Sequence, residues 1–366
     1  MKRKVEFLTN KEIDKQELID VLKNSLNTIS NTEKKILSNI IHDFQNDDFS
    51  LLSNQEIEFL NLHSQKIWAN YLIFRNQFLY NPKNHIVSDF PLYLLIEPVS
   101  ACNLRCVMCF QIDETFSGDK NFMGKMDLEL FKKIVDEAHK NGTKAITLAS
   151  RGEPTLHPNL DEMLDYCSGK FLELKLNTNA TRLTEKIIHK ILKNGVTDIV
   201  FSVDSYQKEE YEKIRVNGIF EQVVENIKRF QQIRNESYPN SVCVTRISGV
   251  KVNKEQDPHS FKNFWEKYVD HVAMVEMEPR WDTYNNPYEF AGTGPCELLW
   301  ERMYVWYDGT VNVCDADYKS KLSPGNINNQ SIREIWNNEN YSNLRQYHKN
   351  GMRNQCHPCD RCPYGS

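Results

Sequence analysis

Apolar residues in the middle of the chain fall into short continuous runs separated by amphipathic segments. The runs at 92–96, 145–149, 172–176, 198–203, 242–247 and 272–277 predict six strands. Segments 128–140 and 185–193 have helical spacing and end at Asn-Gly pairs, which are typical of helix C-termini. This alternation predicts a parallel sheet with right-handed crossovers. The six units are two short of a complete eight-stranded barrel.

The first part of the chain has a different pattern and no cluster of metal-ligating residues. Apolar residues between positions 36 and 44 recur at helical spacing, and Ser30 with Glu33 forms a capping-box pattern before them. Ser53 and Glu56 indicate the start of another helix, which we expect to run toward Tyr80 and to end before a proline. We therefore expect a helical N-terminal extension over residues 1–88.

Composition narrows the class of protein. The chain has 366 residues, 40% hydrophobic residues and a net charge of -5, and its mean hydropathy is -0.60. It contains neither a long apolar run nor an apolar leader at the N-terminus, so we expect a soluble, cytoplasmic protein. Without a basic tract, neither nucleic acid nor a membrane is an expected partner. Ten cysteines in such a protein indicate metal or redox chemistry rather than disulfides.

Three of these cysteines, Cys102, Cys106 and Cys109, follow the first predicted strand at C-x3-C-x2-C spacing. Three close thiolates can hold three irons of a cubane cluster and leave the fourth iron without a protein ligand. An open metal position is where a substrate or cofactor can bind. A structural zinc site is a poor alternative, because such sites use four ligands and usually pair C-x2-C units.

This loop resembles the signature of the radical S-adenosylmethionine (SAM) superfamily. The resemblance implies a partial (β/α)6 TIM-like barrel over residues 89–285, a 4Fe–4S cluster whose open iron binds SAM, and reductive cleavage of SAM to a 5′-deoxyadenosyl radical. It also implies a reductant such as flavodoxin or ferredoxin. The residue before Cys109 is Met108 where an aromatic residue is common, so Phe110 is expected to take over part of the adenine contact.

Further motifs follow the next predicted strands. Gly152-Glu153-Pro154 resembles the motif that binds the SAM amino group, with Arg151 where a first glycine is usual. The resemblance assigns SAM contacts to Gly152, Glu153, Asn177, Asn179, Ser202, Asp204 and Arg215. Two purely structural alternatives stay open. The two asparagines could belong to a polar turn, and Arg215 could form a surface ion pair with Glu212.

The segment after the sixth predicted strand is dense in charged and aromatic residues. We expect Arg280, Glu276 and Asp282 to contact the substrate there as catalytic residues. A fixed arginine favours a developing negative oxygen, and a carboxylate within reach can accept a proton. The alternative is a polar linker whose charges pair with one another at the surface.

The C-terminal part, residues 286–366, holds five cysteines. Two segments around Asp308-Gly309 predict a hairpin between Cys296 and Cys314. The pattern resembles the SPASM/Twitch extension, which implies one auxiliary 4Fe–4S cluster and one spare thiol. The preferred ligands are Cys296, Cys314, Cys356 and Cys359; the alternative replaces Cys356 by Cys362.

The sequence therefore predicts a radical SAM enzyme, an oxidoreductase or an epimerase. We expect a small polar substrate such as a sugar, nucleotide sugar or aminocyclitol, because the pattern implies a single auxiliary cluster. The first alternative is a peptide or protein maturase of the ribosomal-peptide or sulfatase type. The second is an iron–sulfur scaffold without turnover, which would release no 5′-deoxyadenosine.

Overall fold

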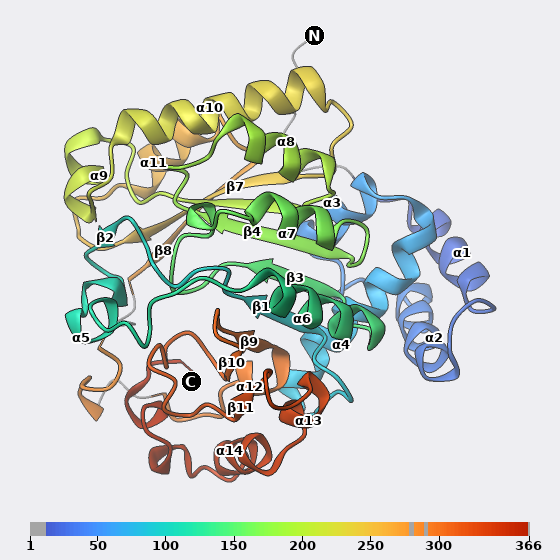
Figure 1. Ribbon diagram of the computed structural model, residues 1–366. Coiled ribbons are helices and arrows are strands. Elements are labelled where there is room, and N and C mark those ends of the chain that lie inside the picture. The colour runs from blue at the N-terminus through green and yellow to red at the C-terminus, as the bar shows by residue number, and fades with distance from the viewer. Residues whose placement is uncertain (1–11, 278–281, 289–291, 365–366) are drawn as a thin grey trace. The chain divides into compact units, whose positions relative to one another are not determined.

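The computed structural model describes residues 12–277, 282–288 and 292–364, and the chain folds as two compact units, residues 1–86 and 87–366 (Figure 1). The first unit is helical, as predicted. Its helices are α1 (Lys15–Ser25), α2 (Asn31–Gln45), α3 (Asn54–Leu62) and α4 (Trp68–Lys83). Helix α1 packs against α2 and α4. Ser30 and Ser53 each complete a capping box, so both predicted helix starts are confirmed.

The single helix expected from Ser53 toward Tyr80 is wrong, because the structure divides it into α3 and α4. A 3-10 turn, Gln65–Ile67, separates the two helices. The indole Nε1 of Trp68, the first residue of α4, donates to the carbonyl oxygens of Leu60 at 3.0 Å and His63 at 3.1 Å. These bonds link the start of α4 to the end of α3. Glu56 of α3 and Arg75 of α4 form a buried ion pair, with 2.7 Å between Oε1 and Nε.

The second unit is built on a nine-stranded sheet with the order β11-β10-β9-β1-β3-β4-β5-β7-β8. Six neighbouring strands, from β1 to the edge strand β8, are parallel and confirm the six predicted strands. They are β1 (Tyr93–Ile96), β3 (Ala145–Leu148), β4 (Glu173–Thr178), β5 (Asp198–Ser202), β7 (Val244–Lys251) and β8 (His271–Glu276). The sheet curves as an incomplete barrel and has the predicted fold class.

Helices lie along the outer side of these strands (Figure 1). They are α6 (Leu128–Lys140), α7 (Leu160–Cys167), α8 (Glu185–Lys193), α9 (Lys208–Ile214), α10 (Phe220–Ser237) and α11 (Pro258–Trp265). Helices α6 and α8 have the predicted bounds. After α6, Gly142 takes a φ of 87°, a left-handed conformation that glycine adopts without strain. Apolar residues from both layers, such as Leu94, Ile146 and Phe131, form the core between them.

The C-terminal part continues the barrel sheet rather than forming a sheet of its own. Strand β9 (Met303–Val305) pairs in parallel with β1, and β10 (Thr310–Asn312) and β11 (Gly325–Asn326) follow antiparallel. The turn at Asp308-Gly309 confirms the predicted hairpin. The helices there are α12 (Leu298–Glu301), α13 (Ile332–Trp336) and α14 (Glu339–Lys349). None of the helices in the described part of the chain is long and apolar enough to cross a membrane.

Candidate active site

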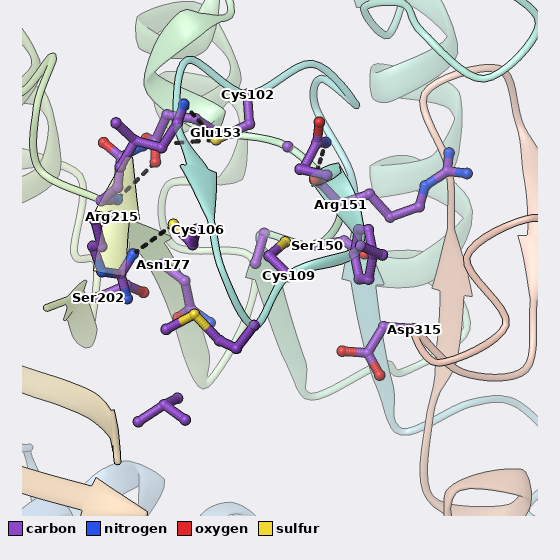
Figure 2. A pocket seen from close by; sticks show the side chains of 18 of the residues that line it. Cys102, Cys106, Cys109, Ser150, Arg151, Glu153, Asn177, Ser202, Arg215 and Asp315 are labelled. Carbon is purple, nitrogen blue, oxygen red and sulfur yellow. Dashed lines mark hydrogen bonds between the residues drawn. The ribbon is translucent and has the colours of Figure 1, made fainter. Parts of the chain in front are cut away.

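A pocket of about 540 Å³ lies at the carboxyl ends of the barrel strands. This volume is in the range of about 300 to 1,000 Å³ that small-molecule and cofactor sites occupy. Its lining comes from the loops after β1 and β3 and from the ends of β4, β5, β7 and β8. Figure 2 shows the three cysteines Cys102, Cys106 and Cys109 in this pocket, together with Ser202, Arg215 and Asp315.

The cysteine loop is held by a short two-stranded sheet. Strand β2 (Arg105–Cys106) pairs antiparallel with β6 (Arg215–Val216), which places Cys106 opposite Arg215. Arg215 Nη1 donates to Cys106 Sγ at 3.8 Å (Figure 2). On the other side of the loop, the backbone N–H of Leu104 donates to Cys102 Sγ at 3.4 Å. Two of the three sulfurs therefore already accept hydrogen bonds.

The environment of these thiols fits an iron–sulfur cluster. Burial raises the pKa of Cys102 and of Cys109 to about 12, so both would stay protonated at neutral pH without a metal. A bound metal replaces the thiol protons outright. All ten cysteines are free thiols. Among the described residues, no three His, Cys, Asp or Glu side chains are placed to hold a single metal ion. A cubane distributes its ligands over different irons, so three thiols spread along one loop can hold such a cluster.

The Gly-Glu-Pro turn packs directly on the backbone of the cysteine loop. A Cβ on Gly152 would lie 2.3 Å from Val99 O and 2.4 Å from Ala101 O, so only glycine fits. Glu153 is buried, and burial raises the pKa of its carboxyl group. Its Oε1 accepts from Thr178 Oγ1 at 2.7 Å and its Oε2 from the N–H of Asn179 at 2.7 Å. The predicted ammonium acceptor is therefore fixed at the pocket wall.

Asn177 and Asn179 lie at the end of β4 and both line the pocket. Asn179 Nδ2 donates to Asn103 Oδ1 at 3.0 Å and to Cys102 Sγ at 3.9 Å. The next residue, Ala180, takes a φ of 61°, the left-handed conformation that glycine adopts more easily. Asn179 thus braces the cysteine loop, while Asn177 belongs to the pocket wall.

The structure places Ser202, Asp204 and Arg215 at different depths. Ser202 and Arg215 line the pocket. Asp204 is fully buried behind them, 2.7 Å from Arg215 Nε, and its Oδ1 accepts from the N–H of Val250 at 2.8 Å. Burial opposes the charge of Arg215, but Asp204 and Cys106 raise its pKa above the usual value. Asp204 orients the arginine and does not line the pocket.

Phe110 lines the pocket, which is the position expected of an adenine contact. Two other aromatic side chains of the protein pack against its ring. The ring stacks on Tyr318, with centroids 4.8 Å apart and an angle of 15° between the planes. Phe116 meets the same ring edge-on at 5.7 Å.

The three predicted substrate-contacting residues have different outcomes. Glu276 is exposed at the rim of the pocket, where its Oε1 lies 3.3 Å from Lys251 Nζ. Asp282 accepts a hydrogen bond from Asn285 Nδ2 at 2.7 Å within its own turn and is not part of the pocket wall. Arg280 lies outside the described residues.

Several residues of the pocket wall received no role from the sequence, among them the polar residues Gln111, Ser150, Arg151 and Asp315. Ser150 Oγ and Gln111 Oε1 are buried and have no hydrogen-bond partner among the described residues. Such orphaned polar atoms fit a pocket that receives a polar ligand. Asp315 comes from the C-terminal part, directly after Cys314. Its position next to a candidate ligand was the only signal in the sequence.

The C-terminal cysteines lie close enough to raise one another's pKa. Burial, and then Cys359, Asp317, Cys362 and Cys296, raise the pKa of Cys314 well above its usual value. Burial, and then Cys296 and Cys362, do the same for Cys359. Cys362 also contributes to the raised pKa of Cys296. Burial and Asp360 raise the pKa of Cys356, which in turn contributes to the raised pKa of Cys359.

Comparisons with known proteins agree with this arrangement. Residues 96–264 match the radical SAM superfamily and residues 296–363 match the SPASM iron-sulfur cluster-binding domain. The chain therefore belongs to the radical SAM superfamily and carries a C-terminal SPASM domain. These domains imply a SAM-binding 4Fe–4S cluster, SAM itself and an auxiliary cluster.

Individual relatives show how far the likeness extends. A tungsten-containing aldehyde ferredoxin oxidoreductase cofactor-modifying protein of Pyrococcus furiosus is 26% identical over 74% of this chain and 89% of its own length. The mycofactocin maturase MftC of Mycobacterium tuberculosis is 28% identical over 52% of this chain, which spans about half of that protein, 46%. The structure of Streptococcus suis SuiB bound to precursor peptide SuiA has a TM-score of 0.59 at 14% identity and covers 92% of this chain and 89% of SuiB. The last likeness concerns the fold.

Proposed function

We propose that this radical SAM enzyme modifies a peptide substrate. The observation that carries the proposal is the rim of the pocket at the end of β8. Val275 and Met277 line the pocket there and are 54% and 45% exposed. An exposed apolar rim suits the side chains of a peptide better than the hydroxyl groups of a sugar. A maturase and a fold relative bound to a precursor peptide support the same choice.

This proposal replaces the small polar substrate that the sequence favoured. That expectation followed from a single auxiliary cluster, which says little about the shape of the pocket rim. A small-molecule substrate is kept as the second candidate, because the Pyrococcus relative, named for modifying a cofactor, covers 74% of this chain.

Bound SAM supplies, after one-electron reduction, the 5′-deoxyadenosyl radical that removes hydrogen from the substrate. We propose that Cys102, Cys106 and Cys109 hold the cluster. Arg215, kept in orientation by Asp204 at 2.7 Å, is the cation for the SAM carboxylate, because a planar guanidinium can bind a carboxylate through two parallel bonds. Glu153 is placed for the SAM amino group.

Asp315 and Glu276 are the proposed contacts on the substrate side. Both carboxylates line the pocket, Glu276 from the barrel and Asp315 from the SPASM domain. A carboxylate within hydrogen-bond reach of the reacting group can accept a proton. Oxidation and epimerisation are both compatible with this arrangement. The electron donor is a one-electron reductant such as flavodoxin or ferredoxin.

For the auxiliary cluster we propose the ligands Cys296, Cys314, Cys359 and Cys362. In every pair among these four thiols, one thiol raises the pKa of the other. Burial and Asp360 raise the pKa of Cys356, which contributes to the raised pKa of Cys359. The guanidinium of Arg353 supports this grouping. It donates to the carbonyl oxygens of Cys359 at 3.0 Å and Cys362 at 2.8 Å, and to that of Gly294 at 3.1 Å, two residues before Cys296.

The test uses anaerobically reconstituted protein with dithionite and SAM. We expect 5′-deoxyadenosine from the wild type and none from the Cys102→Ala, Cys106→Ala, Cys109→Ala triple variant. A library of synthetic peptides should stimulate its release and show a mass or retention change, and Met277→Asp should reduce that stimulation. Stimulation by nucleotide sugars or aminocyclitols, with none by peptides, would transfer the proposal to the second candidate.

A further inference from the structure

Arg151 forms a buried ion pair at the entrance to the Gly-Glu-Pro turn. Its guanidinium donates to Glu97 twice, from Nε to Oε2 at 2.7 Å and from Nη2 to Oε1 at 2.6 Å. The backbone N–H of Arg151 also donates to Glu97 Oε2 at 3.1 Å. Glu97 is fully buried and Arg151 is 3% exposed. Glu97 follows β1 directly, so the pair joins the ends of β1 and β3.

The same guanidinium reaches the SPASM domain. Arg151 Nη1 donates to the carbonyl oxygen of Tyr318 at 2.9 Å, and the guanidinium carbon lies 4.3 Å from the ring centroid of Trp306. Tyr318 comes four residues after Cys314. Its hydroxyl donates to Asp113 Oδ2 at 2.8 Å. Arg151 is therefore shared between the SAM-binding turn and the loop that leaves an auxiliary cysteine.

The turn needs this external support because its own backbone is strained. Ser150, directly before Arg151, takes a φ of 120°, which is unfavourable for a residue with a Cβ. Such conformations persist where the surroundings determine them. Gln111 Nε2 adds a second restraint by donating to the carbonyl oxygens of Arg151 at 2.5 Å and Ser100 at 2.7 Å. Arg151 is thus held at its backbone N–H, its carbonyl group and its side chain.

We propose that Arg151 is a positioning residue that fixes the SAM-binding turn against the SPASM loop through Glu97 and the Tyr318 carbonyl group. The side chain does not contact SAM in this role; it determines where Gly152 and Glu153 stand. The inference rests on the proposed placement of SAM beside Glu153. It explains why a large cation occupies the position where glycine is usual.

A lysine at this position distinguishes positioning from charge alone. Arg151→Lys keeps the positive charge beside Glu97, but a single ammonium group cannot reproduce two parallel bonds to a carboxylate and a third bond to Tyr318. The matched control is Arg234→Lys. Arg234 is also buried and pairs with the partly buried Asp270 at 2.8 Å between Nη2 and Oδ1, and its Nη1 donates to the Cys243 carbonyl group at 2.8 Å. This control pair is not part of the pocket wall.

The experiment measures the Kd for SAM, the EPR signal of the reduced SAM-binding cluster with and without SAM, and the unfolding midpoint. We expect Arg151→Lys to weaken SAM binding about tenfold, equivalent to about 1.4 kcal/mol, and to reduce the change that SAM causes in the EPR signal. The reduction potential of the auxiliary cluster should also shift, because the Tyr318 loop loses a donor. Arg234→Lys should lower the unfolding midpoint and keep the SAM Kd within twofold of the wild type.

A SAM Kd within twofold of the wild type in Arg151→Lys would overturn the inference, as would an equal loss of affinity in Arg234→Lys. Should Arg151→Lys bind no iron, the double variant Glu97→Gln, Arg151→Met removes both buried charges and is expected to fold with weakened SAM binding. Unchanged affinity in that double variant would also overturn the inference. Absence of SAM binding in the wild type would instead refute the proposed function.

Discussion

Replacing one cysteine at a time tests which thiols hold the auxiliary cluster. Two cubanes give roughly eight irons per chain, of which about four belong to the auxiliary site. In the structure, Cys362 contributes to the raised pKa of Cys296, Cys314 and Cys359, whereas Cys356 contributes to that of Cys359. We therefore expect Cys356→Ala to retain roughly eight irons and both EPR signals, because no ligand is lost.

Cys362→Ala should behave in the opposite way. Loss of one of four ligands opens the cluster, so iron should fall toward about four per chain and the auxiliary EPR signal should disappear. The assay is iron and sulfide quantification after anaerobic reconstitution, with EPR of the reduced protein. Cys167→Ala serves as a control, since that thiol is buried in the barrel core. Full iron in Cys362→Ala together with loss in Cys356→Ala would refute the reasoning and restore the set that the sequence favoured.

Three further predictions concern other parts of the chain. Arg215→Lys should weaken SAM binding, measured as Kd, because a point ammonium lacks the bidentate fork of arginine. Burial lowers the pKa of His157, whose Nδ1 accepts from the N–H of Asn159 at 3.1 Å. As the pH falls, the unfolded chain therefore binds a proton at His157 before the folded chain does. The free energy of unfolding is highest above about pH 6.5 and decreases as the pH drops below this value. His157→Gln should reduce this pH dependence, measured by denaturant titration at a series of pH values. Arg75→Met should destabilise the helical unit by about 3 to 5 kcal/mol in chemical denaturation, because it leaves Glu56 buried without its partner at 2.7 Å.

The barrel strands could be predicted because a strand buried on both faces is a continuous apolar run. Strand β1 has this pattern, with all four residues buried. Strand β9 is only three residues long, and the hairpin pattern around Asp308-Gly309 predicts its antiparallel neighbour β10 but not its pairing with β1. That pairing depends on a contact between residues more than 200 positions apart, such as Leu94 and Met303. Local patterns carry no information about such a partner.

The candidate site shows the same division. The cysteine loop was predictable because the three ligands stand at a characteristic spacing in the sequence. Gly152 was predictable because the close approach of two backbone segments requires a glycine, which belongs to a recognisable motif. Asp204 was predicted as a SAM contact, yet the structure places it behind Arg215. The sequence shows that a residue lies near the end of a strand, but not how deeply its side chain is buried. In the sequence, Arg151 is only a departure from the Gly-Glu-Pro motif, at the position where a first glycine is usual. The structure explains the arginine by its hydrogen bond to the carbonyl group of Tyr318, which is 167 residues further along the chain.

Leu95 shows how the continuous sheet joins the two cysteine sites. It lines the pocket, and it also packs in one apolar cluster with Tyr304, Trp306 and Cys314. Tyr304 lies opposite Leu95 in the β1–β9 pairing, so the cluster exists only because β9 continues the barrel sheet. Cys314 is therefore one side-chain layer from the pocket, and Asp315, the next residue, lines it directly. A SPASM domain that merely followed the barrel on a linker would place neither residue there; the shared sheet brings Asp315 into the pocket wall and Cys314 directly behind it.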